Sequence, residues 1–101
     1  MLKESIILKI MPYKLLFHHN ISDDLSKISH DIRSRILKAI QNKVLIYPDK
    51  YGKPLRKPLA GYWKLRVGDY RIVYKITKSE IWILAIMHRK EIYEYIIKNR
   101  L

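Results

Sequence analysis

Residues 62–76 constrain the fold more than any other part of the chain, because two strand-like runs flank a single Gly68–Asp69 step. Both runs are rich in β-branched and aromatic residues. A two-residue turn that begins with glycine supplies the positive φ that a tight hairpin needs. With that turn, Arg66 pairs with Arg71. The sequence therefore predicts an antiparallel hairpin with a fixed register.

That register sorts the side chains of the hairpin into two sets, since directly paired residues share a face of the sheet. The polar set comprises Tyr62, Lys64, Arg66, Arg71 and Lys75. The apolar set comprises Trp63, Leu65, Tyr70, Ile72 and Tyr74. We expect the apolar set to pack on helices, and Trp82 to be a packing residue like Trp63.

Helices are predicted before this hairpin, where apolar residues recur every three or four positions. The stripe comprises Ile21, Leu25, Ile28, Ile32, Ile36, Ile40 and Val44. Ser29 is a natural N-cap and divides the stripe. We expect helices near 20–28 and 30–46, folded as a hairpin that ends before Pro48.

The other elements complete a prediction of the α+β class. Residues 13–17 and 80–88 read as strands, residues 48–61 as a loop, and residues 90–100 as a helix with Ile92, Ile96 and Ile97 on its apolar face. We expect the helical hairpin to pack on one face of a mainly antiparallel, twisted four-stranded sheet, followed by a C-terminal helix. One domain spans residues 12–101. Residues 1–11 read as an N-terminal extension, an extra strand or short helix lying on the domain.

Charge indicates what this domain binds. The chain has 21 Lys and Arg against nine Asp and Glu, a formal net charge of +12, and residues 50–75 hold eight of those cations and one acid. Such proteins usually meet nucleic acid, an anionic membrane or an acidic protein. Because Arg66 and Arg71 repel each other, a surface that receives a polyanion is favoured over a merely solvated one. Apolar anchors at helical spacing, which a membrane surface needs, are missing there.

Several classes of chemistry are excluded or disfavoured. The chain has no cysteine, which excludes disulfides and thiolate nucleophiles. Its four histidines show no metal-ligand spacing, so we expect no metal site. No stretch resembles a signal peptide or a membrane span. We expect a soluble cytoplasmic protein without a membrane partner.

Three segments resemble the RelE/ParE toxin family of type II toxin–antitoxin systems. They are Pro58–Arg66 (PLAGYWKLR), Gly68–Tyr74 (GDYRIVY) and His88–Glu94 (HRKEIYE). The resemblance covers about residues 11–101. The last segment is more typical of the branch that cleaves RNA on the ribosome than of the branch that poisons gyrase.

The resemblance implies a toxin that enters the ribosomal A site and cuts messenger RNA with the ribose 2′-hydroxyl as nucleophile, without metal or cofactor. By position, Lys64 matches a lysine near the scissile phosphate, and Arg71 matches the arginine that binds this phosphate. Arg89 matches an arginine near the leaving group, and Tyr93 an aromatic residue that orients the substrate.

The general base stays open at this point. Some family members have a second catalytic lysine where this chain has Tyr62, so Lys53 or Lys57 are candidates beside Lys64 itself. Like charges nearby favour the neutral form of an amine, which a base requires. His88 is a candidate for proton transfer, because imidazole titrates in the useful range.

The remaining cations are predicted to bind RNA: Lys53, Arg56, Lys57, Arg66 and Lys75. The expected partners are the ribosome with its messenger RNA and a cognate acidic RelB-like antitoxin. The alternatives are a non-catalytic ParE-like gyrase inhibitor and a basic RNA-binding module.

Overall fold

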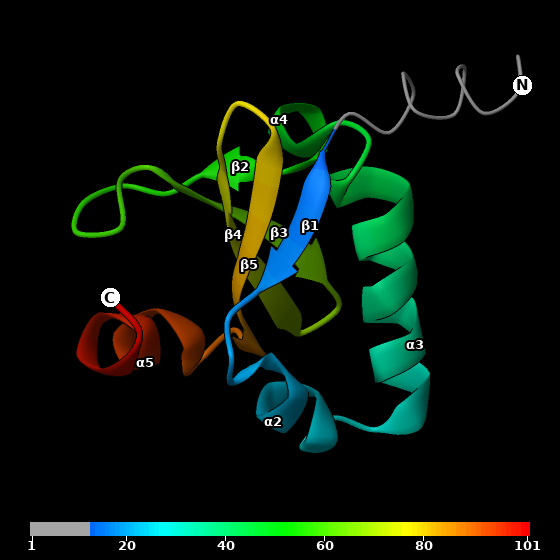
Figure 1. Ribbon diagram of the computed structural model, residues 1–101. Coiled ribbons are helices and arrows are strands. Elements are labelled where there is room, and N and C mark those ends of the chain that lie inside the picture. The colour runs from blue at the N-terminus through cyan, green and yellow to red at the C-terminus, as the bar shows by residue number, and fades with distance from the viewer. Residues whose placement is uncertain (1–12) are drawn as a thin grey trace, which may run out of the picture.

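Five strands form one sheet in the computed structural model, which describes residues 13–101 (Figure 1). The strands are β1 (Lys14–Phe17), β2 (Lys53–Pro54), β3 (Tyr62–Val67), β4 (Tyr70–Ile76) and β5 (Glu80–His88). Their order across the sheet is β1-β5-β4-β3-β2. β1 pairs in parallel with β5, and every other pairing is antiparallel. The prediction of four strands was wrong in number, while the α+β class is confirmed. The predicted extension, residues 1–11, lies outside the described residues.

The segment predicted as a loop contains the missing strand. Residues 48–51 form a short helix, α4 (Pro48–Tyr51), and β2 follows directly. Proline suits the first position of a helix because its nitrogen needs no partner there. Pro54 in turn drives the residue before it into an extended conformation. Because β2 is an edge strand, the missing N–H of Pro54 disrupts little of the ladder.

The predicted hairpin of β3 and β4 is confirmed in its register. Arg66 pairs with Arg71 and Tyr62 with Lys75, as the turn position requires. Gly68 has a φ of 59°, in the left-handed region that favours glycine. The register therefore follows from one local turn.

The main core lies between the sheet and the first helices. These are α2 (Ile21–Ser26) and α3 (His30–Ala39), which continues into the π-helical turn η1 (Ile40–Val44). The predicted apolar stripe of these helices packs in this core, and Ser29 is the N-cap of α3 as expected. Tyr74 is fully buried here, and its hydroxyl donates to the carbonyl of Pro48 at 2.7 Å. A Cβ on Gly52 would collide with that hydroxyl and with the carbonyl oxygen of Pro48, so glycine is required at the close approach.

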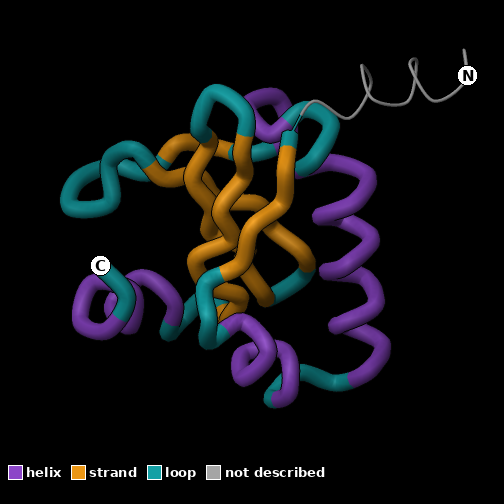
Figure 2. The backbone as a smooth tube through the Cα atoms, viewed as in Figure 1, coloured by secondary structure: helices purple, strands orange, loops and turns teal. Residues whose placement is uncertain are grey.

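The C-terminal helix, α5 (Ile92–Asn99), lies across the sheet from α3 (Figures 1 and 2). Its buried Ile92 and Ile96 join Leu59, Val73 and Ala85 in a second, smaller core. Helices therefore cover both faces of the sheet, with α2 and α3 on one face and α5 on the other.

Two expectations about single side chains were wrong. Ile97 is 43% exposed, because adjacent helical residues point about 100° apart and Ile96 occupies the buried direction. Trp82 is also 43% exposed. Trp82 pairs with Lys75 on β4, so the two side chains share a face of the sheet. This is the face opposite the main core.

Candidate nucleic-acid interface

The hairpin turn brings two arginines together. Arg66 donates from Nε to the carbonyl oxygen of Gly68 at 3.3 Å, and Arg71 donates from Nη1 to the same oxygen at 3.1 Å. Arg71 Nη1 also donates to the carbonyl of Tyr70 at 3.0 Å. These bonds hold two guanidinium groups near one point. Their remaining N–H groups can bind an anion, for which the planar guanidinium fork is well suited.

A second pair of like charges lies beside the first. Lys53 on β2 is the direct partner of Lys64 on β3, so the two ammonium groups share a face. A groove of about 460 Å³ gathers both pairs, and its lining residues are Tyr51, Lys53, Lys64, Leu65, Arg66 and Arg71. We call this the four-cation groove. It unites four of the predicted site residues.

Tyr93 on α5 lies next to this groove. The ammonium nitrogen of Lys64 is 5.8 Å from the centre of the Tyr93 ring, within the range of a cation–π contact. The ring is half-buried and packs against the second core. The helix therefore sets the position of the aromatic residue beside the cations.

Arg89 lies at the far side of the hairpin turn. Its backbone N–H donates to the carbonyl of Asp69 at 2.8 Å, and its Nε lies 3.8 Å from Asp69 Oδ1. Both side chains are more than half exposed, so this ion pair is weak and leaves the guanidinium free to meet a ligand.

His88 is not brought together with the four-cation groove. It pairs with Tyr70, and the two rings meet edge to face at 5.6 Å between centroids. Tyr70 belongs to the apolar set, on the opposite face from Arg71 and Lys64. The Nδ1 of His88 accepts the backbone N–H of Lys90 at 3.2 Å, which holds this ring at the end of the strand.

The remaining predicted RNA-binding residues lie apart from this groove. Arg56 and Lys57 are exposed in the segment between β2 and β3. Lys75 faces a separate depression beside Trp82. The five residues predicted to bind RNA thus divide among the four-cation groove (Lys53 and Arg66), an exposed loop (Arg56 and Lys57) and a second depression (Lys75).

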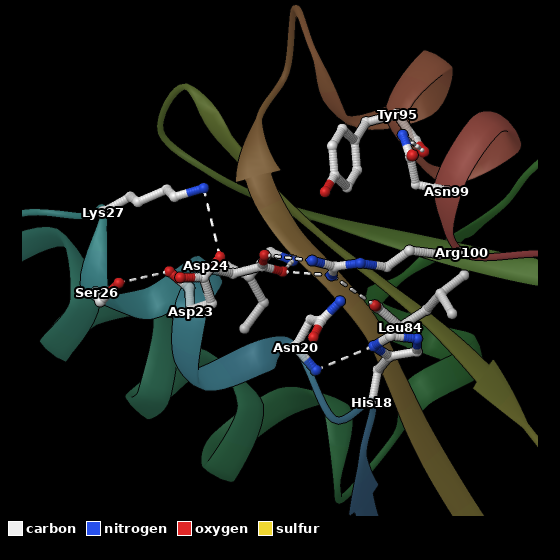
Figure 3. Close-up of polar contacts among 11 residues, drawn as sticks. His18, Asn20, Asp23, Asp24, Ser26, Lys27, Leu84, Tyr95, Asn99 and Arg100 are labelled. Carbon is white, nitrogen blue, oxygen red and sulfur yellow. Dashed lines mark hydrogen bonds and ion pairs between the residues drawn. The ribbon is translucent and has the colours of Figure 1, made fainter.

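A buried ion pair that sequence reasoning missed holds α5 in place (Figure 3). Arg100 meets Asp24 of α2 through two bonds of 2.6 Å, and both side chains are almost fully buried. The Arg100 guanidinium also donates to the carbonyl of Leu84, and Asp24 accepts the N–H of Ile86. Hydrogen bonding to Asp24 raises the pKa of Arg100, so its guanidinium stays charged.

The ion pair provides hydrogen-bond partners for backbone groups of β5, the carbonyl of Leu84 and the N–H of Ile86, that β1 does not reach. β1 ends at Phe17, opposite Ile83. At the next residue, Leu84, the pairing of β4 and β5 shifts by one position in a β-bulge, which redirects backbone polar groups. No local sequence pattern indicates this contact, because its partners are 76 residues apart.

Within residues 13–101, no cluster of three His, Asp or Glu side chains could hold a metal ion. None of the helices in that part of the chain is long and apolar enough to cross a membrane.

The mixed sheet, the helices on both faces and the paired cations at one hairpin define a small basic α+β domain. The family model of ParE toxins of type II toxin–antitoxin systems matches residues 15–93. The chain belongs to this RelE/ParE family, and it is a toxin of a type II toxin–antitoxin system.

Curated relatives and solved structures agree with this membership. Toxin RelG of Mycobacterium tuberculosis is 34% identical over 85 residues, covering 82% of this chain and 98% of the relative. Toxin RelE3 of Methanocaldococcus jannaschii is 32% identical, covering 81% and 97%. The toxin–antitoxin complex RelBE2 of M. tuberculosis contains a similar chain, with a TM-score of 0.71, 32% identity and coverage of 77% and 99%.

Proposed function

We propose that this toxin is a ribosome-dependent endoribonuclease that cleaves messenger RNA in the A site. One observation carries the proposal: four cations from β2, β3 and β4 line a single groove beside the ring of Tyr93. Curated relatives with RelE-type names support it. Such an enzyme would act in the cytoplasm, where ribosomes translate.

The proposed reaction needs no group beyond the RNA and the side chains of the site. The ribose 2′-oxygen attacks the adjacent phosphorus and loses its proton, while the bond from phosphorus to the 5′-oxygen breaks and that oxygen gains a proton. The products are a 2′,3′-cyclic phosphate and a 5′-hydroxyl. Negative charge on the phosphate oxygens is greatest in the transition state, where Arg71 and Arg66 would stabilise it.

Two lysines compete for the role of general base. Lys64 and Lys53 are direct partners on β3 and β2 and both line the four-cation groove, so both are candidates for the base. Lys57, in the exposed segment, lies outside the groove. His88 lies on the face of the sheet opposite the four-cation groove. We therefore assign Arg89, rather than His88, to contact the leaving 5′-oxygen.

Replacement of the principal phosphate ligand tests the proposal. Arg71→Ala should lower messenger cleavage by about 10²–10³-fold, the loss typical of one transition-state donor. The measurement maps messenger ends in cells that express the toxin and follows growth arrest. Arg33→Ala on α3 is the matched control and should retain both activities. Unchanged cutting by a folded Arg71→Ala protein would refute the assignment.

The ParE model that matches the chain favours a second candidate, a gyrase inhibitor that cuts no RNA. It would use the same cations to approach a gyrase–DNA complex. Double-strand DNA breaks without new messenger ends, in the same expressing cells, would establish this reading instead.

We further propose a cognate acidic antitoxin. Two similar solved structures are toxin–antitoxin complexes, and a net charge of +12 favours an acidic partner. A segment that folds on binding could cover the region around α5 and mask Tyr93 and Arg89. Hydrogen exchange with and without the co-purified partner checks this, and protection should reach residues 62–97.

A further inference from the structure

A second depression lies on the same face of the sheet as the four-cation groove, at the end of the β3–β4 hairpin away from Gly68. Its volume is about 590 Å³, and three aromatic rings, one lysine and two histidines contribute to its lining: Phe17, Tyr62, Trp82, Lys75, His18 and His19. We call it the Trp82 groove. None of the described residues that line it is acidic.

Sheet pairing aligns its main residues in one row. Lys75 is the partner of Tyr62 on one side and of Trp82 on the other. The row therefore alternates aromatic ring, cation and aromatic ring across three strands. The partners share a face, so all three side chains rise from the same side of the sheet.

The ring of Trp82 is partly exposed to solvent and is oriented by a hydrogen bond. Its indole N–H donates to Glu80 Oε1 at 3.2 Å, which orients the ring. The side chain remains 43% exposed, and Phe17 at the edge of the groove is 46% exposed. His18 and His19, which also line the groove, stack on each other at 4.2 Å between ring centroids.

This combination matches the chemistry of a single-stranded nucleic acid. An unpaired base stacks on an aromatic ring, while its phosphate meets a neighbouring cation. A duplex hides the faces of its bases, so it gains little from such a groove. An acidic peptide could meet Lys75 but would leave the flat faces of the aromatic rings without a matching planar group.

We propose that the Trp82 groove binds an unpaired nucleobase of RNA, with the base stacked on Trp82 and its phosphate on Lys75. The site is separate from the four-cation groove and takes no part in the reaction. It rests on the proposed function only in taking RNA as the ligand. It would add a second point of attachment to ribosomal or messenger RNA.

Fluorescence of a single tryptophan tests the stacking directly. The chain has two tryptophans, and Trp63→Phe leaves Trp82 as the reporter. A single-stranded RNA oligonucleotide should quench this fluorescence. An abasic oligonucleotide of equal length keeps the phosphates but has no bases, and it should bind without quenching. Equal quenching by both would overturn the proposal.

Affinity measurements with labelled single-stranded RNA provide the second test. Trp82→Leu should weaken binding by about tenfold, the loss expected for one stacked base. Tyr47→Leu, at an aromatic residue that is 54% exposed outside the groove, should leave the affinity unchanged. Lys75→Met should weaken binding and reduce its salt dependence by about one phosphate contact. Thermal unfolding confirms that each variant is folded.

The outcomes separate this proposal from that of cleavage. Trp82→Leu should retain the cutting positions of the parent, whereas Arg71→Ala should lose cutting and keep the quenching of Trp82. If Trp82→Leu binds RNA as tightly as the parent, the nucleobase site is refuted while cleavage is untouched. If polyglutamate quenches Trp82 and the RNA does not, the groove is a peptide site.

Discussion

On the α3 side of the sheet, apolar side chains of α2, α3 and three strands meet in the main core, where Tyr74 is fully buried. On the α5 side, a smaller core leaves much of the surface to cations and exposed aromatic rings. The same strands supply both faces, so the contrast follows from alternation along each strand. One face stabilises the fold, and this permits the other to hold like charges that repel one another.

On the α5 side, the register of β2, β3 and β4 places like charges opposite each other. Two cross-strand pairs of like charge, Lys53 with Lys64 and Arg66 with Arg71, lie side by side. Directly opposed like charges cost stability, so a surface that keeps two such pairs is suited to a ligand that neutralises them. Asp24 and Arg100 then join helices from the two sides across the edge of β5.

Breaking that connection should have the largest effect. Asp24→Asn leaves the guanidinium of Arg100 buried without its counter-charge, which should lower the free energy of unfolding by about 3–5 kcal/mol. Urea denaturation measures the loss. Hydrogen exchange should show that the α5 region opens more readily than the main core.

The neighbouring residue provides a matched control for this prediction. Asp23 pairs with Lys27 at 3.4 Å on the surface. Asp23→Asn should therefore change the unfolding free energy by no more than about 1 kcal/mol. Equal losses in the two variants would show that the buried pair contributes nothing particular to the link between the two sides.

On the apolar face, burial of Tyr74 should make the free energy of unfolding depend on pH in the alkaline range. Burial raises the pKa of the Tyr74 phenol far above its usual range, and the nearby carboxylate of Asp49 adds to the effect. Its stabilising contribution is fully present below about pH 10, where the unfolded phenol begins to ionise, and is lost as pH rises through the folded pKa. Above pH 10 this group should remove about 1.4 kcal/mol of stability per pH unit.

Tyr74→Phe separates this group from others that titrate in the same range. At neutral pH the variant should lose about 1–3 kcal/mol, because the carbonyl of Pro48 loses its buried donor. Above pH 10 its stability should fall less steeply than that of the parent in denaturant titrations. Tyr47→Phe, at an exposed position, should follow the parent curve. Parallel curves for Tyr74→Phe and the parent would contradict the assignment.

The charged face should give the smallest change in stability. Arg66→Thr removes one member of a repelling pair and places a good strand former on β3, but it also removes a weak bond to the Gly68 carbonyl. We expect the unfolding free energy to stay within about 0.5 kcal/mol of the parent. Unfolding in low and high salt should differ less than in the parent. A loss well above this range would mean that Arg66 is structural.

The structural features that depend on residues close together in the sequence could be predicted. The Gly68–Asp69 turn determined the register, which in turn placed Arg66 opposite Arg71 and Lys64 on the same face. The apolar stripe of α2 and α3 likewise followed from helical periodicity. Resemblance to a family supplied the proposed roles of individual residues, which the structure leaves to experiment.

Contacts between distant segments could not be predicted in this way. β2 is two residues long, too short for any periodicity, yet it puts Lys53 opposite Lys64. The side of the sheet that α5 covers depends on how the chain leaves β5, and Trp82 is exposed because α5 does not extend over it. The Asp24–Arg100 pair has no signature in the sequence around either residue.

The separation of Asp24 and Arg100 in the sequence also limits the order in which the newly made chain can fold. Translation proceeds from the N-terminus, and the early helices can begin to fold while later residues are still being added. Asp24 must wait for 76 further residues before its partner exists. The helix that carries Tyr93 therefore cannot be secured beside Lys64 until the chain has been made as far as Arg100.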